Sequence, residues 1–199
     1  MRYECRFVDS DNVNPRWEEI EAVSLREVVT GESPRLMTRV RACWTQMALL
    51  IRFECEDDHV VATMEQHDDP IFLEDVVEAF IDTSGTGRVY YELEVSPRNV
   101  VFDALVHNDL AGAKTVDTSW HAPGLVTKIS TDTEGWRMYE LHIPFADLGV
   151  TPESGTTWNW NLYRIDDDEQ GNRHYWAWSP TGKVNFHIPQ QFGRIFFQK

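Results

Sequence analysis

Acidic and aromatic side chains share one face of a predicted β-hairpin formed by residues 76–82 and 89–95. Successive side chains of a β-strand point to opposite faces, so residues two apart lie on the same face. If the branched aliphatic residues of both strands face a core, the opposite face carries the others: Glu78, Phe80, Tyr90, Glu92 and Glu94. Carboxylates accept hydrogen bonds from hydroxyl groups, and aromatic rings can stack on the apolar face of a pyranose. This face is therefore a candidate site for a hydroxyl-rich ligand.

The same carboxylates also suggest an enzymatic alternative. Glycosidases place two carboxylates across the scissile bond, about 5 to 9 Å apart, and Glu78 with Glu92 or Glu94 could meet that distance. Strand faces of an acidic protein carry such pairs routinely, however, so the pairing alone does not predict catalysis. We expect binding without catalysis and keep a carbohydrate-active enzyme as the alternative.

Tryptophan is abundant, with eight residues in a chain of 199. Trp17, Trp44, Trp136 and Trp158 lie in strand-like or amphipathic contexts, where large side chains are expected to form the core. Trp176 and Trp178 instead lie where a predicted strand gives way to a loop, and aromatic residues at loop edges are freer to bind ligands. Both are predicted to line the site, although their spacing puts them on one face, where one of them can equally join the core.

Segments rich in β-branched and aromatic residues recur along the chain, separated by clusters of Gly, Pro, Asn and Asp. The clearest hairpin covers residues 38–56, where the alternation puts Cys55 on the inner face and Cys43 on the outer face. Further strands are predicted at residues 100–106, 125–131, 136–143, 157–165, 174–179 and 194–197. The pattern predicts one domain over residues 1–199, an all-β, antiparallel two-sheet β-sandwich of immunoglobulin-like or jelly-roll-like type with very little helix.

Several motifs, in order along almost the whole chain, are similar to those of a known family. They are RACW at residues 41–44, LIRF at 50–53, DPIFLEDVVEAFID at 69–82, IPF at 143–145, WNWN at 158–161, WSP at 178–180 and FGRI at 192–195. No single motif is strong, but the ordered set is specific. The chain resembles the family 9 carbohydrate-binding modules, within the DOMON-like β-sandwich superfamily.

The resemblance implies a non-catalytic site in which two aromatic rings sandwich the terminal sugar of a mono- or oligosaccharide. By position these rings correspond to Phe72 and Trp178, and a sugar-contacting glutamate corresponds to Glu78. Phe72 stands where the family often has tryptophan, which implies a smaller stacking platform. Glu92 and Glu94 occupy the strand that supplies a sugar-binding arginine in well-known members, so the ligand must meet hydrogen-bond acceptors there. The resemblance also implies structural calcium.

The charge and hydropathy of the chain limit the classes of partner and the location that we expect. The formal net charge of −15 repels the phosphates of nucleic acids and anionic membrane surfaces. No apolar run approaches the roughly 20 residues that cross a bilayer, and the N-terminal residues do not read as a signal peptide. We expect a soluble protein, cytoplasmic as written or secreted if an export signal was removed.

Three cysteines without CxxC spacing, Cys5, Cys43 and Cys55, are expected to be reduced thiols.

Metal and haem sites are further alternatives. Calcium prefers several oxygen ligands gathered on loops, and acidic clusters occur at Asp9/Asp11, Asp57/Asp58, Asp68/Asp69 and residues 166–169, none with EF-hand spacing. The seven histidines are scattered, without zinc-type spacing; His187 could line the site but more simply has a structural, hydrogen-bonded role. The related DOMON cytochrome domains suggest Met64 and His67 as haem ligands, without a haem-binding signature. A protein-interaction domain is a last alternative.

Overall fold

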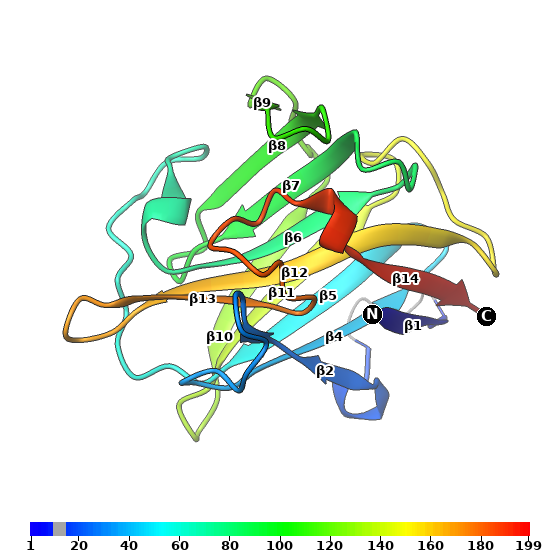
Figure 1. Cartoon of the computed structure of the whole chain (residues 1–199). Coiled ribbons are helices and arrows are strands. Elements are labelled where there is room, and N and C mark those ends of the chain that lie inside the picture. Colours follow the sequence, from blue (N-terminus) through cyan, green and yellow to red (C-terminus); the bar gives the residue numbers. More distant parts are fainter. Residues whose placement is uncertain (10–14) are drawn as a thin grey trace.

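The described part of the chain, residues 1–9 and 15–199 of a computed structural model, is built almost entirely from β-strands (Figure 1). Helix is limited there to three short 3-10 turns, η1 (Trp17–Glu19), η2 (Ile71–Leu73) and η3 (Pro189–Gln191). The strands are β1 (Arg2–Phe7), β2 (Ala22–Ser24), β3 (Arg26–Glu27), β4 (Thr38–Trp44), β5 (Ala48–Cys55), β6 (Val76–Asp82), β7 (Val89–Val95), β8 (Val101–Asn108), β9 (Lys114–Asp117), β10 (Val126–Thr131), β11 (Arg137–Pro144), β12 (Thr157–Asp167), β13 (Arg173–Ala177) and β14 (Gly193–Gln198). The prediction of an all-β fold with very little helix is confirmed.

Hydrogen bonds join the strands into one curled, mixed sheet rather than the two separate antiparallel sheets that we predicted. Its main order is β10-β11-β5-β4-β1-β14-β12-β6-β7-β8-β9, with β2, β3 and β13 attached at the side. The N-terminal strand β1 is the reason for the difference, because it pairs in parallel with both β4 and β14. It therefore connects the layer β10-β11-β5-β4 to the layer β12-β6-β7-β8 (Figure 1).

The main hydrophobic core lies between these layers. Val77, Ala79 and Ile81 of β6 contribute to it, as the alternation predicted, and they share it with residues of β4, β5, β11 and β14. Burying such aliphatic and aromatic side chains is the main favourable term in folding. Each layer therefore shows its other face to the outside or to covering loops.

A second hydrophobic cluster covers the outer face of β6, β7, β8 and β12. Phe80 and Tyr90, on the face opposite the main core, pack there with Tyr163 and with Phe186 from the segment that precedes η3. The sequence predicted which residues share this face, but not that loops would cover it. Glu78, Glu92 and Glu94 lie on the same face and are buried as well.

The cysteines follow the prediction. Cys55 belongs to the main core, whereas Cys43 packs on the outer side of its layer beside Trp17 and Ile20. Cys5, Cys43 and Cys55 are all buried free thiols. Burial raises the pKa of the Cys43 thiol to about 12, which keeps it protonated and unreactive at neutral pH.

The β6–β7 turn fixes the register of the two strands that carry the three glutamates. Asp82 accepts hydrogen bonds from the backbone N–H groups of Ser84 and Gly85 through Oδ1, and from that of Gly87 through Oδ2. Both glycines have positive φ angles, 70° and 73°, which most other residues rarely adopt. A single buried carboxylate thus holds the hairpin in the pairing that sets Glu78 opposite Glu94.

Candidate functional site

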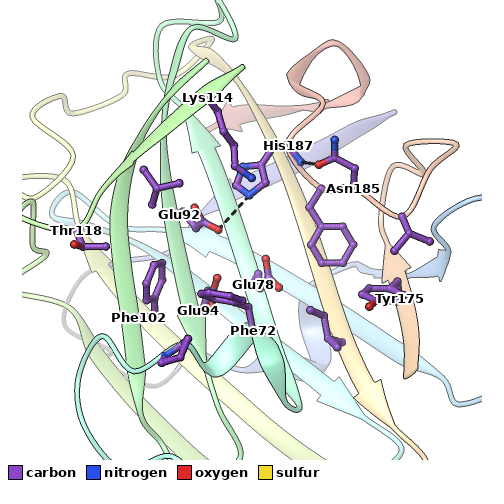
Figure 2. A pocket seen from close by; sticks show the side chains of 15 residues that line it. Phe72, Glu78, Glu92, Glu94, Phe102, Lys114, Thr118, Tyr175, Asn185 and His187 are labelled. Carbon is purple, nitrogen blue, oxygen red and sulfur yellow. Dashed lines mark hydrogen bonds and ion pairs between the residues drawn. The ribbon is translucent and has the colours of Figure 1, made fainter. Parts of the chain in front are cut away.

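A pocket of about 520 Å³ lies on the outer face of β6, β7 and β8 (Figure 2). This volume falls within the range of roughly 300–1,000 Å³ typical of small-molecule sites. Its lining combines aromatic side chains, three carboxyl groups and a few polar groups at the rim: Phe72, Phe102, Tyr175 and Phe186; Glu78, Glu92 and Glu94; Lys114, Thr118, Asn185 and His187. The pocket is thus largely apolar with its acidic groups gathered in one place.

Glu78, Glu92 and Glu94, which we call the glutamate triad, project from the strands that form the floor (Figure 2). Glu78 and Glu94 are direct cross-strand partners, and Glu92 follows two residues away on the same face of β7. One oxygen of each lies within 4.8 Å of the others. Their exposed fractions are only 2%, 5% and 1%, so the structure brings together, in a nearly dry environment, three of the residues that we predicted for the site.

Several triad oxygens accept no hydrogen bond from a protein donor. These are Oε1 of Glu78, Oε2 of Glu92 and both oxygens of Glu94. Buried polar atoms are nearly always hydrogen-bonded, because leaving one unsatisfied costs about 1–3 kcal/mol. Groups aimed into a pocket without partners are therefore ready to accept hydrogen bonds from a ligand.

Burial dominates the electrostatics of the triad. It raises the pKa of Glu78 and of Glu94 well above the ordinary range, and the neighbouring carboxylates raise both further. Burial also raises the pKa of Glu92 to about 7, while the neighbouring side chain of Glu94 and the charge of Lys114 act in the opposite direction. At neutral pH the triad consequently retains protons, and a protonated carboxyl group can donate a hydrogen bond as well as accept one.

His187 lies beside the triad without neutralising it. Its Nε2 atom is 3.7 Å from Oε1 of Glu92, and its Nδ1 atom is 2.9 Å from the hydroxyl oxygen of Tyr90 (Figure 2). Burial, and then the nearby charge of Lys114, lower the pKa of His187 to about 3, so the imidazole is neutral at physiological pH. The expected hydrogen-bonded role of His187 is confirmed, and the residue also lines the pocket.

Aromatic rings form the pocket walls. Phe72, 39% exposed, meets Phe102 edge-on with 5.7 Å between ring centroids. Across the pocket, Tyr175 contacts Phe186, whose ring stacks on Tyr163 with centroids 4.1 Å apart. Because Phe72 lies within the 3-10 turn η2, on the exposed side of a surface segment, its ring is the most accessible of these aromatic rings.

Trp178 does not face Phe72 across the pocket, and that part of the prediction is wrong. Trp178 is 3% exposed and belongs to the main core, where its ring packs edge-on against Trp160. Gly193 makes this possible, because a β-carbon at that position would overlap the indole ring. The missing side chain on β14 leaves a space into which the indole folds inward.

Trp176 is also buried in the main core, with 1% of its surface exposed, and it stacks on His174 and Arg164. It points away from the pocket because side chains along β13 alternate, and its neighbour Tyr175 is the one that lines the pocket. The alternation that assigned Trp176 and Trp178 to one face is correct, but that face is the inner one.

Sequence reasoning missed most of the other lining residues, and four of them show why. Phe102 was recoverable, because it is the cross-strand partner of Glu94 and so shares its face. Tyr175 follows from alternation once Trp176 is known to be buried. Lys114 and Phe186 reach the pocket from a short edge strand and a covering loop, and no local pattern in the sequence indicates this.

Most carboxylates of the acidic loop clusters already contact hydrogen-bond donors of the protein. Arginine side chains bind the carboxylates of Asp57, Asp58, Asp166 and Asp167, and Asn172 and His174 bind Asp168. Oδ2 of Asp69 accepts backbone hydrogen bonds. Calcium needs several oxygens free to coordinate it, so these paired groups do not fit the structural calcium that the resemblance implied. Asp11 lies outside the described residues.

The two residues considered as haem ligands are held by other parts of the protein. Met64 packs against the outer hydrophobic cluster. His67 lies 3.2 Å from Asp68 and 3.6 Å from Asp103, with one ring nitrogen toward each carboxylate. Neither residue lines the pocket on the outer face of β6, β7 and β8, so the structure gives the haem interpretation no support there.

Taken together, the curled sheet and the pocket define a β-sheet ligand-binding domain, with aromatic walls above an acidic floor. A family model, described as carbohydrate family 9 binding domain-like, matches residues 8–199. The chain belongs to this family. No helix in residues 1–9 and 15–199 is long and apolar enough to cross a membrane.

Individual proteins are also similar to this chain in sequence or in structure. A protein of Arthroderma benhamiae named "Extracellular protein" is 28% identical over 188 residues, covering 88% of this chain and 85% of the relative. Two structures of a family 9 carbohydrate-binding module from Caldicellulosiruptor kristjanssonii, one with cellotriose and one with glucose, each superpose with a TM-score of 0.72 at 18% identity. They cover all of this chain and 94% and 96% of theirs. A Bacteroides uniformis structure gives 0.77 at 19% identity, covering 99% of both chains. These structural likenesses concern the fold.

Proposed function

We propose that the pocket binds the end of a neutral mono- or oligosaccharide without transforming it. The observation that carries this proposal is the set of unpartnered triad oxygens beneath a half-exposed aromatic ring. Sugar hydroxyls would supply the missing donors, while the ring of Phe72 would cover the apolar face of a pyranose. Cellotriose and glucose, the ligands in the Caldicellulosiruptor kristjanssonii complexes, are the first compounds to test.

The arrangement of the triad favours binding over glycoside hydrolysis. A retaining glycosidase separates its two carboxyl groups by about 5–5.5 Å and an inverting one by about 6.5–9.5 Å, with the substrate between them. Here oxygens of all three glutamates lie within 4.8 Å of one another on a single floor. They would approach a sugar ring from the same side, which suits hydrogen bonding but not the two roles of hydrolysis.

Two substitutions test this site. Phe72→Ala removes the exposed ring, and Glu78→Leu keeps the bulk of the side chain but removes both acceptor oxygens. Each is expected to weaken sugar binding up to about tenfold, since a stacking contact or a hydrogen bond contributes about 0.5–1.5 kcal/mol. Isothermal titration calorimetry is the appropriate measurement, because the lining found among the described residues contains no tryptophan to report binding by fluorescence.

Matched controls are available beside the pocket. Leu73→Ala removes an exposed apolar side chain that does not line the pocket, and it should leave affinity unchanged. Binding that survives both Phe72→Ala and Glu78→Leu would contradict the proposed site. Release of reducing sugar from oligosaccharides by the wild-type protein would instead favour the enzymatic alternative.

The name of the Arthroderma benhamiae relative supports a location outside the cell, where polysaccharide ligands occur. We infer that this chain acts there too, in place of the cytoplasmic location considered from the sequence. Immunoblots of medium and cell lysate from the native host should find the protein mainly in the medium. Recovery only from the lysate would contradict this inference.

A further inference from the structure

Four potential metal ligands from three separate segments meet around β8, on the face of this strand opposite Phe102. His67 and Asp68 precede η2, Asp103 lies on β8, and His121 lies in the loop after β9. One ligand atom of each lies within 4.8 Å of the others. We call these four residues the His67 cluster; the scattered sequence positions gave no indication of it.

The spacing of these atoms suits a single small ion. Four ligands at the zinc bond length of about 2.0–2.1 Å, arranged as a tetrahedron, lie about 3.3–3.4 Å apart. His67 Nδ1 is 3.2 Å from Asp68 Oδ2, and His121 Nδ1 is 3.1 Å from Asp103 Oδ1. His121 Nδ1 is also 3.8 Å from Asp68 Oδ2. Small side-chain adjustments would complete the coordination.

The two carboxylates are held in place by the backbone. Asp103 is 2% exposed, and its Oδ2 accepts a hydrogen bond from the backbone N–H of Ala122, which leaves Oδ1 toward the imidazoles. The N–H of Asp68 donates to the carbonyl of Val101 on β8, and the φ angle of Asp68 is 64°. Strained backbone of this kind persists where surrounding contacts enforce it, often at functional sites. Outer hydrogen bonds that orient ligands are typical of metal sites.

We propose that the His67 cluster binds a divalent transition-metal ion of the Zn²⁺ class. Two imidazoles with two carboxylates are ligands that zinc accepts readily, whereas Ca²⁺ and Mg²⁺ prefer oxygen ligands alone. The imidazoles of His67 and His121 are about half exposed, so an ion can reach them from solvent.

Such an ion would connect the segments that border the pocket. Phe102 is adjacent to Asp103, Thr118 precedes His121 by three residues, and Phe72 follows Asp68 by four. Bridging these segments would restrain the aromatic wall on that side. The metal site itself does not depend on the proposed sugar binding, whereas an effect of the metal on sugar affinity would.

The test uses tag-free protein stripped with a chelator and titrated with Zn²⁺, Co²⁺ and Ca²⁺ by calorimetry. We expect one Zn²⁺ per chain, visible Co²⁺ bands typical of low coordination number, and an increase in Tm of about 5–10 °C at hundredfold excess over Kd. Calcium should give no comparable shift. His67→Ala and His121→Ala should each weaken Zn²⁺ binding at least tenfold, without changing the circular dichroism spectrum.

His107→Ala is the matched control, because it removes an exposed histidine outside the cluster. Zn²⁺ binding that is absent from the wild type, or equal in the His67→Ala, His121→Ala and His107→Ala variants, would overturn the proposal. In that case the four side chains form histidine–aspartate ion pairs only. A metal-loaded protein that binds no sugar would leave the metal site standing and refute only the sugar-binding proposal.

Discussion

Trp178→Ala is expected to destabilise the fold by about 3–5 kcal/mol, the usual cost of removing a large buried aromatic side chain. The indole is buried in the main core against Trp160 and beneath Gly193. For a chain of this length the change corresponds to a decrease in Tm of roughly 6–20 °C. Thermal and urea unfolding of the two proteins measure the effect directly.

Two further variants separate a structural role of Trp178 from a role in the pocket. Gly193→Ala would force a methyl group into the indole and should also destabilise the protein, although it removes no aromatic ring. Phe72→Ala, at a half-exposed position, should leave Tm nearly unchanged. A Trp178→Ala protein with wild-type Tm but no affinity for sugar would show that the indole belongs to the binding site after all.

Replacing all three triad glutamates by glutamine is expected to stabilise the protein increasingly as pH rises. Burial raises the pKa of Glu92 to about 7 and raises those of Glu78 and Glu94 well above the ordinary value of about 4.5, to which unfolding returns each group. Above pH 4.5 the unfolded chain therefore releases protons that the folded state retains. The free energy of unfolding of the wild type falls by about 1.4 kcal/mol per pH unit for each such group. The contribution of Glu92 to this pH dependence ends near pH 7.

The triple glutamine variant lacks these titrating carboxyl groups, so they do not lower its free energy of unfolding as pH increases. Urea unfolding at intervals from pH 4 to pH 8 should show the two stabilities diverging as pH increases, with the variant ahead by several kcal/mol at pH 8. Glu134→Gln, at an exposed turn position, serves as the control and should follow the wild type. Stability curves of the wild type and the triple variant that run parallel over this pH range would show that the folded triad does not retain protons, and would contradict the prediction.

Alternation along strands was the most informative signal in the sequence. It placed Glu78, Glu92 and Glu94 on one face and Val77, Ala79 and Ile81 on the other, because the two-residue period is a local property of extended backbone. Which face is buried is decided by packing between layers, and on β6 both faces are buried. The face that the sequence indicated as a candidate site is therefore a pocket partly covered by loops.

The errors came from contacts between distant parts of the chain. Trp178 lies inside because β14, 15 residues later in sequence, has glycine at the position beneath its ring. His67 and His121 are 54 residues apart and meet only because both segments border β8. The parallel bridge made by β1 likewise depends on strands from opposite ends of the chain. No spacing rule within a segment contains this information.

The odd–even division of the hairpin assigns contact with the pocket and packing between the layers to different side chains. Even-numbered positions of β6 and β7, such as 78, 92 and 94, face the pocket, while odd-numbered ones, such as 77 and 93, fill the space between the layers. Mutations at the first set can alter what is recognised while the scaffold keeps its shape. A designer could therefore diversify positions 78, 92 and 94 to change specificity, while keeping Phe80 and Tyr90 in the outer hydrophobic cluster and the odd-numbered residues in the main core.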